Sequence, residues 1–233
     1  MHVFYAPNAQ PPLVTLDETE SGHAIRVLRL KPGERVLVVD GAGTTMEGAI
    51  ETDHPRKCSV HIDGKIEREP GSNGLFTLVL SPTKSNDRME WLVEKATEIG
   101  IHRFEFMLSR YSERKQINTE RLRKVAVAAM KQSGRATLPY IGEMLPFPEI
   151  VKTPFIGDSF IAHCYPGEKP HLKELLKPNQ NIRVLIGPEG DFSPDEVELA
   201  LKAGFKEISL GNSRLRTETA ALVACITASL SNL

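Results

Sequence analysis

The sequence predicts an α/β protein in which a small barrel of short strands precedes a largely parallel sheet with helices on both faces. Three observations support this fold class. The chain before residue 69 contains short apolar segments separated by turn residues. From Leu75 onward, strand-like and helix-like segments alternate. Between the two parts, Glu69–Gly74 (EPGSNG) is the most linker-like stretch, which predicts domains at residues 1–71 and 72–233.

In the first domain, strands are expected at residues 36–39 and 46–50, on either side of the hairpin signal Asp40–Gly43 (DGAG). A third strand is expected at 57–62, where apolar and polar residues alternate. Only Ser21–Leu30 is helix-like, and the following Lys-Pro-Gly ends it.

In the second domain, each strand-like segment is followed by a helix-like one. Strands are expected at 75–80, 104–108, 160–163, 184–186 and 208–210. Helices are expected from Asp87 to Gly100, from Asn118 or Thr119 to Gly134, from Ser193 onward, and from Thr217 to Leu230. Asp87 with Glu90 predicts a capped helix start, and Ser193 with Glu196 predicts a capping box. This alternation predicts a parallel sheet whose ligands bind beyond the carboxyl ends of the strands.

Two loops near the C-terminus are the candidates for chemistry. The first is Ile186–Phe192 (IGPEGDF), and the second is Leu210–Thr219 (LGNSRLRTET), which leads into a helix rich in alanine. Glycines in both loops allow the backbone to approach a ligand closely. Composition alone leaves open that both are ordinary turns between a strand and a helix.

The charge distribution indicates a polyanionic partner. The net charge is −1, but residues 71–140 carry 12 Lys and Arg against 7 Asp and Glu, a balance of +5, and seven of the twelve are arginine. Arginine forms paired hydrogen bonds with phosphate and stacks on bases. A set of solvated helix faces explains the same charges equally well.

Several function classes are disfavoured. The chain has no GxxxxGK[ST] phosphate loop, no dinucleotide-binding glycine pattern and no GxSxG motif, which argues against a nucleotide-using metabolic enzyme. The three cysteines are far apart and the histidines lack metal-ligand spacing, so neither a disulfide framework nor a metal site is predicted. Cys164, next to His163, is expected to be a packing residue. No membrane span or secretory signal is visible, which favours the cytoplasm.

Motifs along the whole chain resemble one protein family. They are HAIRVLR (23–29) before Pro32-Gly33, KSNDRME (84–90), EKATEIG (94–100), KQSGR (131–135) with Leu138-Pro139, LIGPEG (185–190) and LRTETA (215–220). The last two, in this order and spacing, are the most specific. The chain is similar to the 16S rRNA uridine N3-methyltransferases, which belong to the SPOUT class.

The resemblance implies a SPOUT-type parallel sheet with a C-terminal trefoil knot, preceded by a PUA-like β-barrel that binds RNA. It implies the cofactor S-adenosylmethionine, a homodimer, and the 16S rRNA of the small ribosomal subunit as the substrate. The methylated atom would be N3 of a decoding-region uridine, uridine 1498 in the usual rRNA numbering.

The resemblance also assigns residues. The cofactor would be bound by His163, Ile186, Gly187, Pro188, Glu189, Gly190, Leu210, Gly211, Leu215 and Arg216. RNA contacts are expected from Arg26, Arg29, Lys84, Arg88, Arg110, Arg114, Lys115 and Arg135. Arg216 would stabilise negative charge that develops on the uracil carbonyls, and Glu218 would accept the N3 proton. Water as the acceptor, with Glu218 acting only as a helix N-terminal carboxylate, stays open.

The sequence departs from the family pattern at two positions. Asp191 stands where glycine is frequent, and aspartate is expected to tolerate a left-handed backbone there. In the second loop the usual arginine is displaced by one position, so that Ser213 precedes Arg214.

Three alternatives remain at the level of the sequence. One is a SPOUT methyltransferase with another RNA target, and another is one that methylates a ribose 2′-hydroxyl. The third is a non-catalytic RNA-binding factor in ribosome assembly, which would need the basic segment but not intact cofactor loops.

Overall fold

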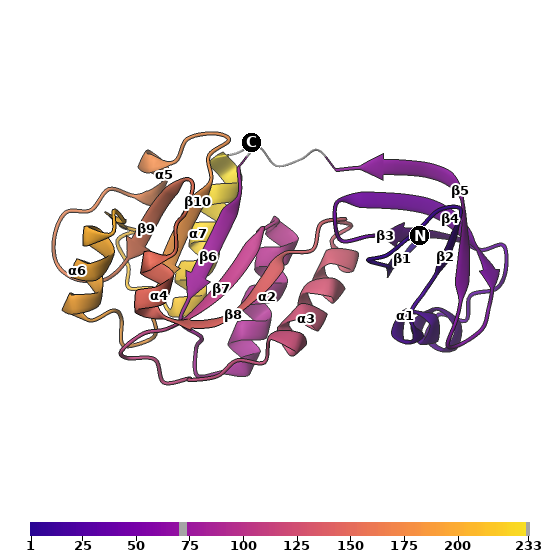
Figure 1. The fold of residues 1–233 in the computed structure, drawn as a ribbon, viewed down its shortest axis with the longest axis horizontal. Helices are drawn as coiled ribbons and strands as arrows, with labels where there is room; N and C mark the ends of the chain where they lie inside the picture. Colours follow the sequence, from indigo (N-terminus) through magenta and orange to yellow (C-terminus); the bar gives the residue numbers. More distant parts are fainter. Residues whose placement is uncertain (70–73, 232–233) are drawn as a thin grey trace. The chain divides into compact units, whose positions relative to one another are not determined.

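The computed structural model describes residues 1–69 and 74–231, and these form two compact units (Figure 1). The first unit comprises Met1–Gly71 together with Val127–Leu138, and the second comprises Ser72–Ala126 together with Pro139–Leu233. The boundary predicted between residues 71 and 72 falls among residues 70–73, outside the described residues.

The first unit is built on a five-stranded sheet with the order β1-β3-β4-β5-β2. The strands are β1 (His2–Tyr5), β2 (Leu13–Thr15), β3 (Arg35–Val39), β4 (Thr44–Thr52) and β5 (Ser59–Arg68). Strands β1 and β3 pair in parallel and the other pairs are antiparallel. The three predicted strands are present, with β4 and β5 longer than expected. The sequence prediction missed β1 and β2, which are too short to show a clear alternation.

The helical segment of this unit begins earlier than predicted. Helix α1 (Glu18–Gly22) starts after Asp17, whose side chain accepts a hydrogen bond from the Glu20 amide. It continues as one π-helical segment, η1 (His23–Val27), in place of the single helix predicted from Ser21 to Leu30. Arg29 then takes a left-handed conformation (φ 57°), which stops the helix before Leu30.

The second unit contains a six-stranded sheet in which every pair of neighbours is parallel, as predicted, with the order β11-β9-β10-β6-β7-β8. Its strands are β6 (Phe76–Leu80), β7 (Arg103–Leu108), β8 (Tyr140–Pro146), β9 (Asp158–Ala162), β10 (Ile182–Ile186) and β11 (Lys206–Ile208). All residues of β6 and β10 are buried, because helices cover both faces of the sheet.

The helices of this unit are α2 (Asn86–Ile99), α4 (Phe147–Lys152), α5 (Leu172–Leu175), α6 (Pro194–Lys202) and α7 (Thr217–Ser231). Helix α3 (Thr119–Gln132) begins in this unit, and its residues from Val127 onward belong to the first unit. Helices α4 and α6 share one apolar cluster with the strands, whereas α2 and α7 pack together, with α7 also against β6 and β10 (Figure 1). Strand β8 and helices α4 and α5 were not predicted.

The helix starts predicted at Thr119 and Thr217 are confirmed, and one predicted helix start is wrong. Gly100 ends α2 with φ 102°, and Ser193 with Glu196 forms the predicted capping box of α6. Asp87 is not the N-cap of α2, because the helix starts one residue before it and Ser85 occupies the cap position. Asp87 instead lies in the first turn, where its negative charge faces the positive end of the helix.

The sheet order determines where a ligand can bind. Strands β11, β9 and β10 are neighbours and pair in parallel, so the loops that follow them leave the same edge of the sheet. None of the helices in the described part of the chain is long and apolar enough to span a membrane.

Candidate functional site

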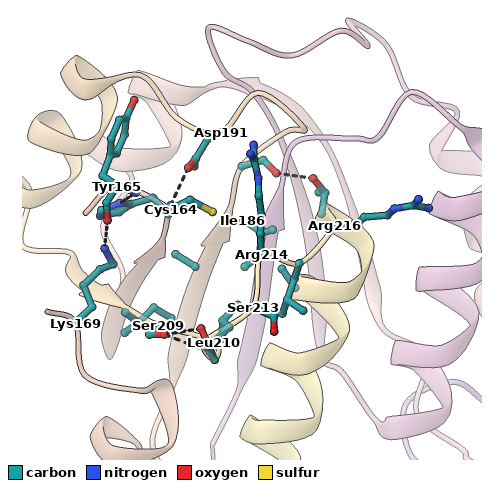
Figure 2. Close-up of a pocket in the computed structure, with 18 of the residues that line it drawn as sticks. Cys164, Tyr165, Lys169, Ile186, Asp191, Ser209, Leu210, Ser213, Arg214 and Arg216 are labelled. Atoms are coloured by element: carbon teal, nitrogen blue, oxygen red, sulfur yellow. Dashed lines mark hydrogen bonds between the residues drawn. The ribbon is translucent and has the colours of Figure 1, made fainter. Parts of the chain in front are cut away.

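A pocket of about 660 Å³ lies at the carboxyl ends of β9, β10 and β11 (Figure 2). Three segments line it: the loop after β9 with Cys164, the loop after β10 with Gly187, and the loop from β11 into α7 with Arg214. This is the edge at which open parallel sheets bind ligands. The predicted loops therefore do lie together, and the segment after β9 joins them.

The loop after β10 is held in place from two directions. The hydroxyl of Thr217, the first residue of α7, donates a hydrogen bond of 3.0 Å to the Gly187 carbonyl. The carboxylate of Glu189 accepts a hydrogen bond of 3.2 Å from the Lys84 amide, in the loop after β6. Glu189 thus orders its own loop, in addition to lining the pocket.

Gly190 belongs to this loop but is not among the lining residues described. A Cβ atom added at this glycine would lie 2.9 Å from the Cβ of Tyr111. The absence of a side chain is therefore explained by close packing against the loop after β7, and the structure gives no pocket contact for the residue.

The loop after β9 begins with a fixed histidine. The Tyr165 amide donates to His163 Nδ1 (3.2 Å), so the ring proton is on Nε2, which donates to Glu207 at 2.8 Å. The side chain of His163 is 2% exposed. His163 lines the pocket as predicted, and its hydrogen bonds hold the ring in one orientation.

The prediction that Cys164 is a packing residue is wrong. Cys164 is exposed and lines the pocket, whereas Cys58 and Cys225 are buried. Burial of part of the side chain, together with the negative charge of Asp191, raises the pKa of the Cys164 thiol. At neutral pH this thiol is therefore protonated.

The loop from β11 into α7 carries two arginines, Arg214 and Arg216, whose side chains point in different directions (Figure 2). Both line the pocket. Figure 2 shows the Arg214 side chain inside the pocket, extending towards the loop that carries Asp191, while the Arg216 side chain points away from it. The displaced arginine is thus the one that faces the pocket interior, whereas Arg216 faces away from it (Figure 2).

Glu218 is not among the residues of the described chain that line the pocket. It is 7% exposed, and its Oε1 lies 3.5 Å from Nε of Arg88 on α2. Its Oε2 has no hydrogen-bond partner in the described part of the chain. The predicted catalytic carboxylate and the predicted RNA-binding Arg88 therefore form an ion pair between α7 and α2.

Apart from Arg88 on α2, the predicted RNA-binding cations of the second unit lie in the loops after β6 and β7, at the same edge of the sheet as the pocket. Arg110 pairs with Asp195 (3.3 Å), and Lys84 with Glu113 (3.1 Å). Arg114 donates to the carbonyls of Thr83 and Lys84, so it stabilises the loop after β6. Lys115 is exposed.

The remaining predicted RNA-binding residues belong to the first unit. Arg26 lies on the π-helical segment and Arg29 follows it, and both are exposed. Arg135 is partly buried after the end of α3.

Sequence reasoning missed several pocket residues. The segment after β9, with Tyr165 and Lys169, carries no motif, and only the sheet order places it beside the other two loops. The described residues contain no group of three or more His, Cys, Asp or Glu side chains suited to a metal ion.

Two family models match the chain. Residues 72–229 match an RNA methyltransferase domain, and residues 16–63 match an RNA methyltransferase PUA domain. The first match covers more than half of the sequence.

Similar proteins match nearly the full length of the chain. A ribosomal RNA small subunit methyltransferase E of Aquifex aeolicus is 30% identical over 233 residues, covering 94% of this chain and 95% of that protein. The structure of a probable rRNA-methyltransferase from Porphyromonas gingivalis is 41% identical, with a TM-score of 0.88 and coverage of 97% and 95%. A ribosomal RNA small subunit methyltransferase E from Neisseria gonorrhoeae, bound to S-adenosyl methionine, is 26% identical, with a TM-score of 0.86 and the same coverage.

Proposed function

The chain belongs to the RNA methyltransferase family, and we propose that it transfers the methyl group of S-adenosylmethionine to N3 of a uridine in 16S rRNA. Relatives of nearly the same length are named small-subunit rRNA methyltransferases, and one was crystallised with this cofactor. The observation that carries the proposal is the three-loop pocket at the carboxyl ends of β9, β10 and β11. Uridine 1498, in the usual rRNA numbering, is the proposed target.

The pocket suits the cofactor chemically. Its volume of about 660 Å³ lies within the range of small-ligand pockets. Ile186, Leu210 and Leu215 offer apolar surface for an adenine ring, and the backbone around Gly187 and Gly211 offers hydrogen-bonding groups. When bound, S-adenosylmethionine supplies an activated methyl group on a sulfonium ion. Arg214 is placed to meet the cofactor carboxylate, and Glu189 adds negative charge near a cationic ligand.

The uridine must be exposed, oriented and deprotonated at N3 for transfer to occur. Arg216 lines the pocket and points away from its interior, so we assign it to the uracil carbonyls, where negative charge develops. Glu218 is the candidate proton acceptor, with water as the alternative. Its ion pair with Arg88 and its burial favour water, and Glu218 is not among the described residues that line the pocket.

The finer architecture is also part of the proposal. A trefoil knot is supported by the insertion of β10 between β9 and β6 and by the contact of Thr217 with Gly187. A homodimer is supported by exposed apolar side chains on the packed pair α2 and α7, namely Trp91 (43%), Ile226 (42%) and Leu230 (64%). We place the enzyme in the cytoplasm, where ribosomal subunits are found.

The test is transfer of labelled methyl from S-adenosylmethionine to small ribosomal subunits from a strain that lacks this protein. We expect label in 16S rRNA and none in large-subunit RNA. Replacement of Arg216 by Ala should reduce the rate about 100-fold or more with cofactor binding unchanged, as for loss of one donor to a developing oxyanion. Cofactor binding without transfer to any ribosomal RNA would contradict the proposed substrate.

Glu218→Gln tests the proton acceptor separately. If Glu218 accepts the proton, the substitution should lower kcat about 100-fold or more. If water accepts it, kcat should change little and only the stability of the α2–α7 contact should fall.

A further inference from the structure

Asp191 links two of the pocket loops through its carboxylate. Its Oδ2 accepts a hydrogen bond of 2.8 Å from the Cys164 amide, which belongs to the loop after β9 (Figure 2). Its Oδ1 accepts a hydrogen bond of 2.8 Å from the amide of Phe192. One side chain in the loop after β10 thus holds two backbone amides, one of them 27 residues away in the sequence.

The backbone conformation of Asp191 is unusual for a residue with a side chain. Its φ is 64°, in the left-handed region that glycine adopts most readily. The sequence-based expectation that aspartate tolerates this conformation is confirmed. A glycine would adopt this backbone conformation without strain, but it has no carboxylate to accept the hydrogen bond from the Cys164 amide. We therefore explain the aspartate by the two hydrogen bonds that it accepts.

We propose that Asp191 is a positioning residue that clamps the loop after β9 onto the loop after β10 and so holds the Cys164 and Tyr165 backbone ready for the cofactor. The proposal deepens the proposed function and rests on it for the identity of the ligand. Hydrogen bonds to a carboxylate are shorter and stronger than neutral ones, which suits a clamp between two loops.

A second bond joins the same two loops without involving Asp191. The Tyr165 hydroxyl donates to the Phe192 carbonyl at 2.7 Å, and Lys169 donates to the Tyr165 carbonyl. Loss of the clamp should therefore loosen the Cys164 end of the segment and leave the fold intact. The expected consequence is weaker cofactor binding with an unchanged maximal rate.

The first test uses the full-length protein without cofactor. Hydrogen exchange of the Cys164 amide is compared in wild type, Asp191→Gly, Asp191→Asn and the control Glu198→Gln. Glu198 is an exposed carboxylate on α6 that pairs only with Lys202 among the described residues. Exchange at Cys164 should be about tenfold faster or more in Asp191→Gly, intermediate in Asp191→Asn, and unchanged in the control, because a tenfold factor corresponds to one modest hydrogen bond. Unchanged exchange in Asp191→Gly would overturn the clamp.

The second test measures S-adenosylmethionine binding by calorimetry, with methyl transfer measured in parallel. Asp191→Gly should raise the cofactor Kd and KM about tenfold with kcat unchanged, and Asp191→Asn should restore part of the affinity. If Asp191→Asn binds the cofactor no better than Asp191→Gly while its Cys164 amide is still protected, Asp191 contacts the ligand directly and positioning is overturned.

The two tests separate this proposal from the proposed function. If wild type binds no S-adenosylmethionine, the proposed function fails, and the exchange data without ligand still decide whether the loops are clamped.

Discussion

Cys164 is the residue whose environment differs most from the one predicted. It lies close after strand β9, where a packed side chain is expected, but its side chain is exposed and lines the pocket. Its amide donates a hydrogen bond to the Asp191 carboxylate. A sequence cannot show this, because the exposure depends on the sheet order that places the loops side by side.

The raised pKa of the Cys164 thiol predicts its reactivity. A raised pKa means that less of the reactive thiolate is present at any pH below it, so alkylation by iodoacetamide should be slow at pH 7 and accelerate as the pH rises. Asp191→Asn removes a negative charge beside the sulfur, so the pKa should fall and the rate at pH 8 should increase. Mass spectrometry of the modified peptide gives the rate for Cys164 alone.

Cys58 and Cys225 serve as internal controls in that experiment. Burial raises the pKa of Cys58 to about 11 and raises that of Cys225 as well, and both side chains are buried. Modification of either at a rate similar to Cys164 would contradict the account of the pocket.

Among the predicted site residues, the sequence identified those that occur in motifs. Gly187, Leu210 and Arg216 lie in the pocket, because their loops directly follow strands whose carboxyl ends share one edge. The sequence could not show that Glu218 differs from these residues, because the direction of its side chain depends on how α7 packs against α2.

Helix α4 shows why some elements could not be predicted. It is six residues long and begins with Phe147-Pro148, which gives no helical periodicity to detect. The C-terminal end of α4 is instead stabilised from the sheet. Nη1 of Arg183, on β10, donates to the carbonyls of Ile150 and Thr153, both at 3.2 Å.

Arg183 is expected to contribute substantially to stability. It is 5% exposed, its guanidinium lies between the rings of Phe155 (4.9 Å) and Phe205 (4.7 Å), and its burial lowers its pKa. Replacement by Met leaves the α4 carbonyls without their donor and should cost about 2–4 kcal/mol, from two or three lost hydrogen bonds of a charged group. Urea denaturation measures this cost.

Arg183→Lys is the matched variant for that measurement. Lysine keeps the charge but cannot reach two carbonyls and stack between two rings as a planar group, so it should recover only part of the loss. If Arg183→Met were as stable as wild type, the carbonyls of Ile150 and Thr153 would not depend on Arg183 as their donor, which would contradict this prediction.

At the scale of the whole molecule, the alternation of strands and helices predicted the parallel sheet correctly. The contribution of residues 127–138 to the first compact unit could not be predicted, because that segment is separated from residues 1–71 in the sequence. Within this unit, Lys131 pairs with the buried Glu20 at 2.5 Å, and Glu69 accepts from the Ala136 amide and the Thr137 hydroxyl.

Breaking the ion pair between Lys131 and Glu20 should lower the stability of the protein. Glu20 is 6% exposed and Lys131 has a side chain 19% exposed, so Lys131→Met should destabilise the protein by about 3 kcal/mol through an unpaired buried charge. The double variant with Glu20→Gln should recover most of this loss. Thermal unfolding of Lys131→Met, Glu20→Gln and the double variant tests the coupling, and simple additivity of the two single effects would refute it.

The central claim is that the three-loop pocket directs methyl transfer to uracil N3. The most direct measurement is mass spectrometry of nucleosides and of nuclease fragments from 16S rRNA, after incubation of the enzyme and S-adenosylmethionine with small subunits from a strain lacking the protein. We predict 3-methyluridine at uridine 1498 with wild type, and its loss with Arg216→Ala. A 2′-O-methylated nucleoside, or methylation only of another RNA, would contradict the claim.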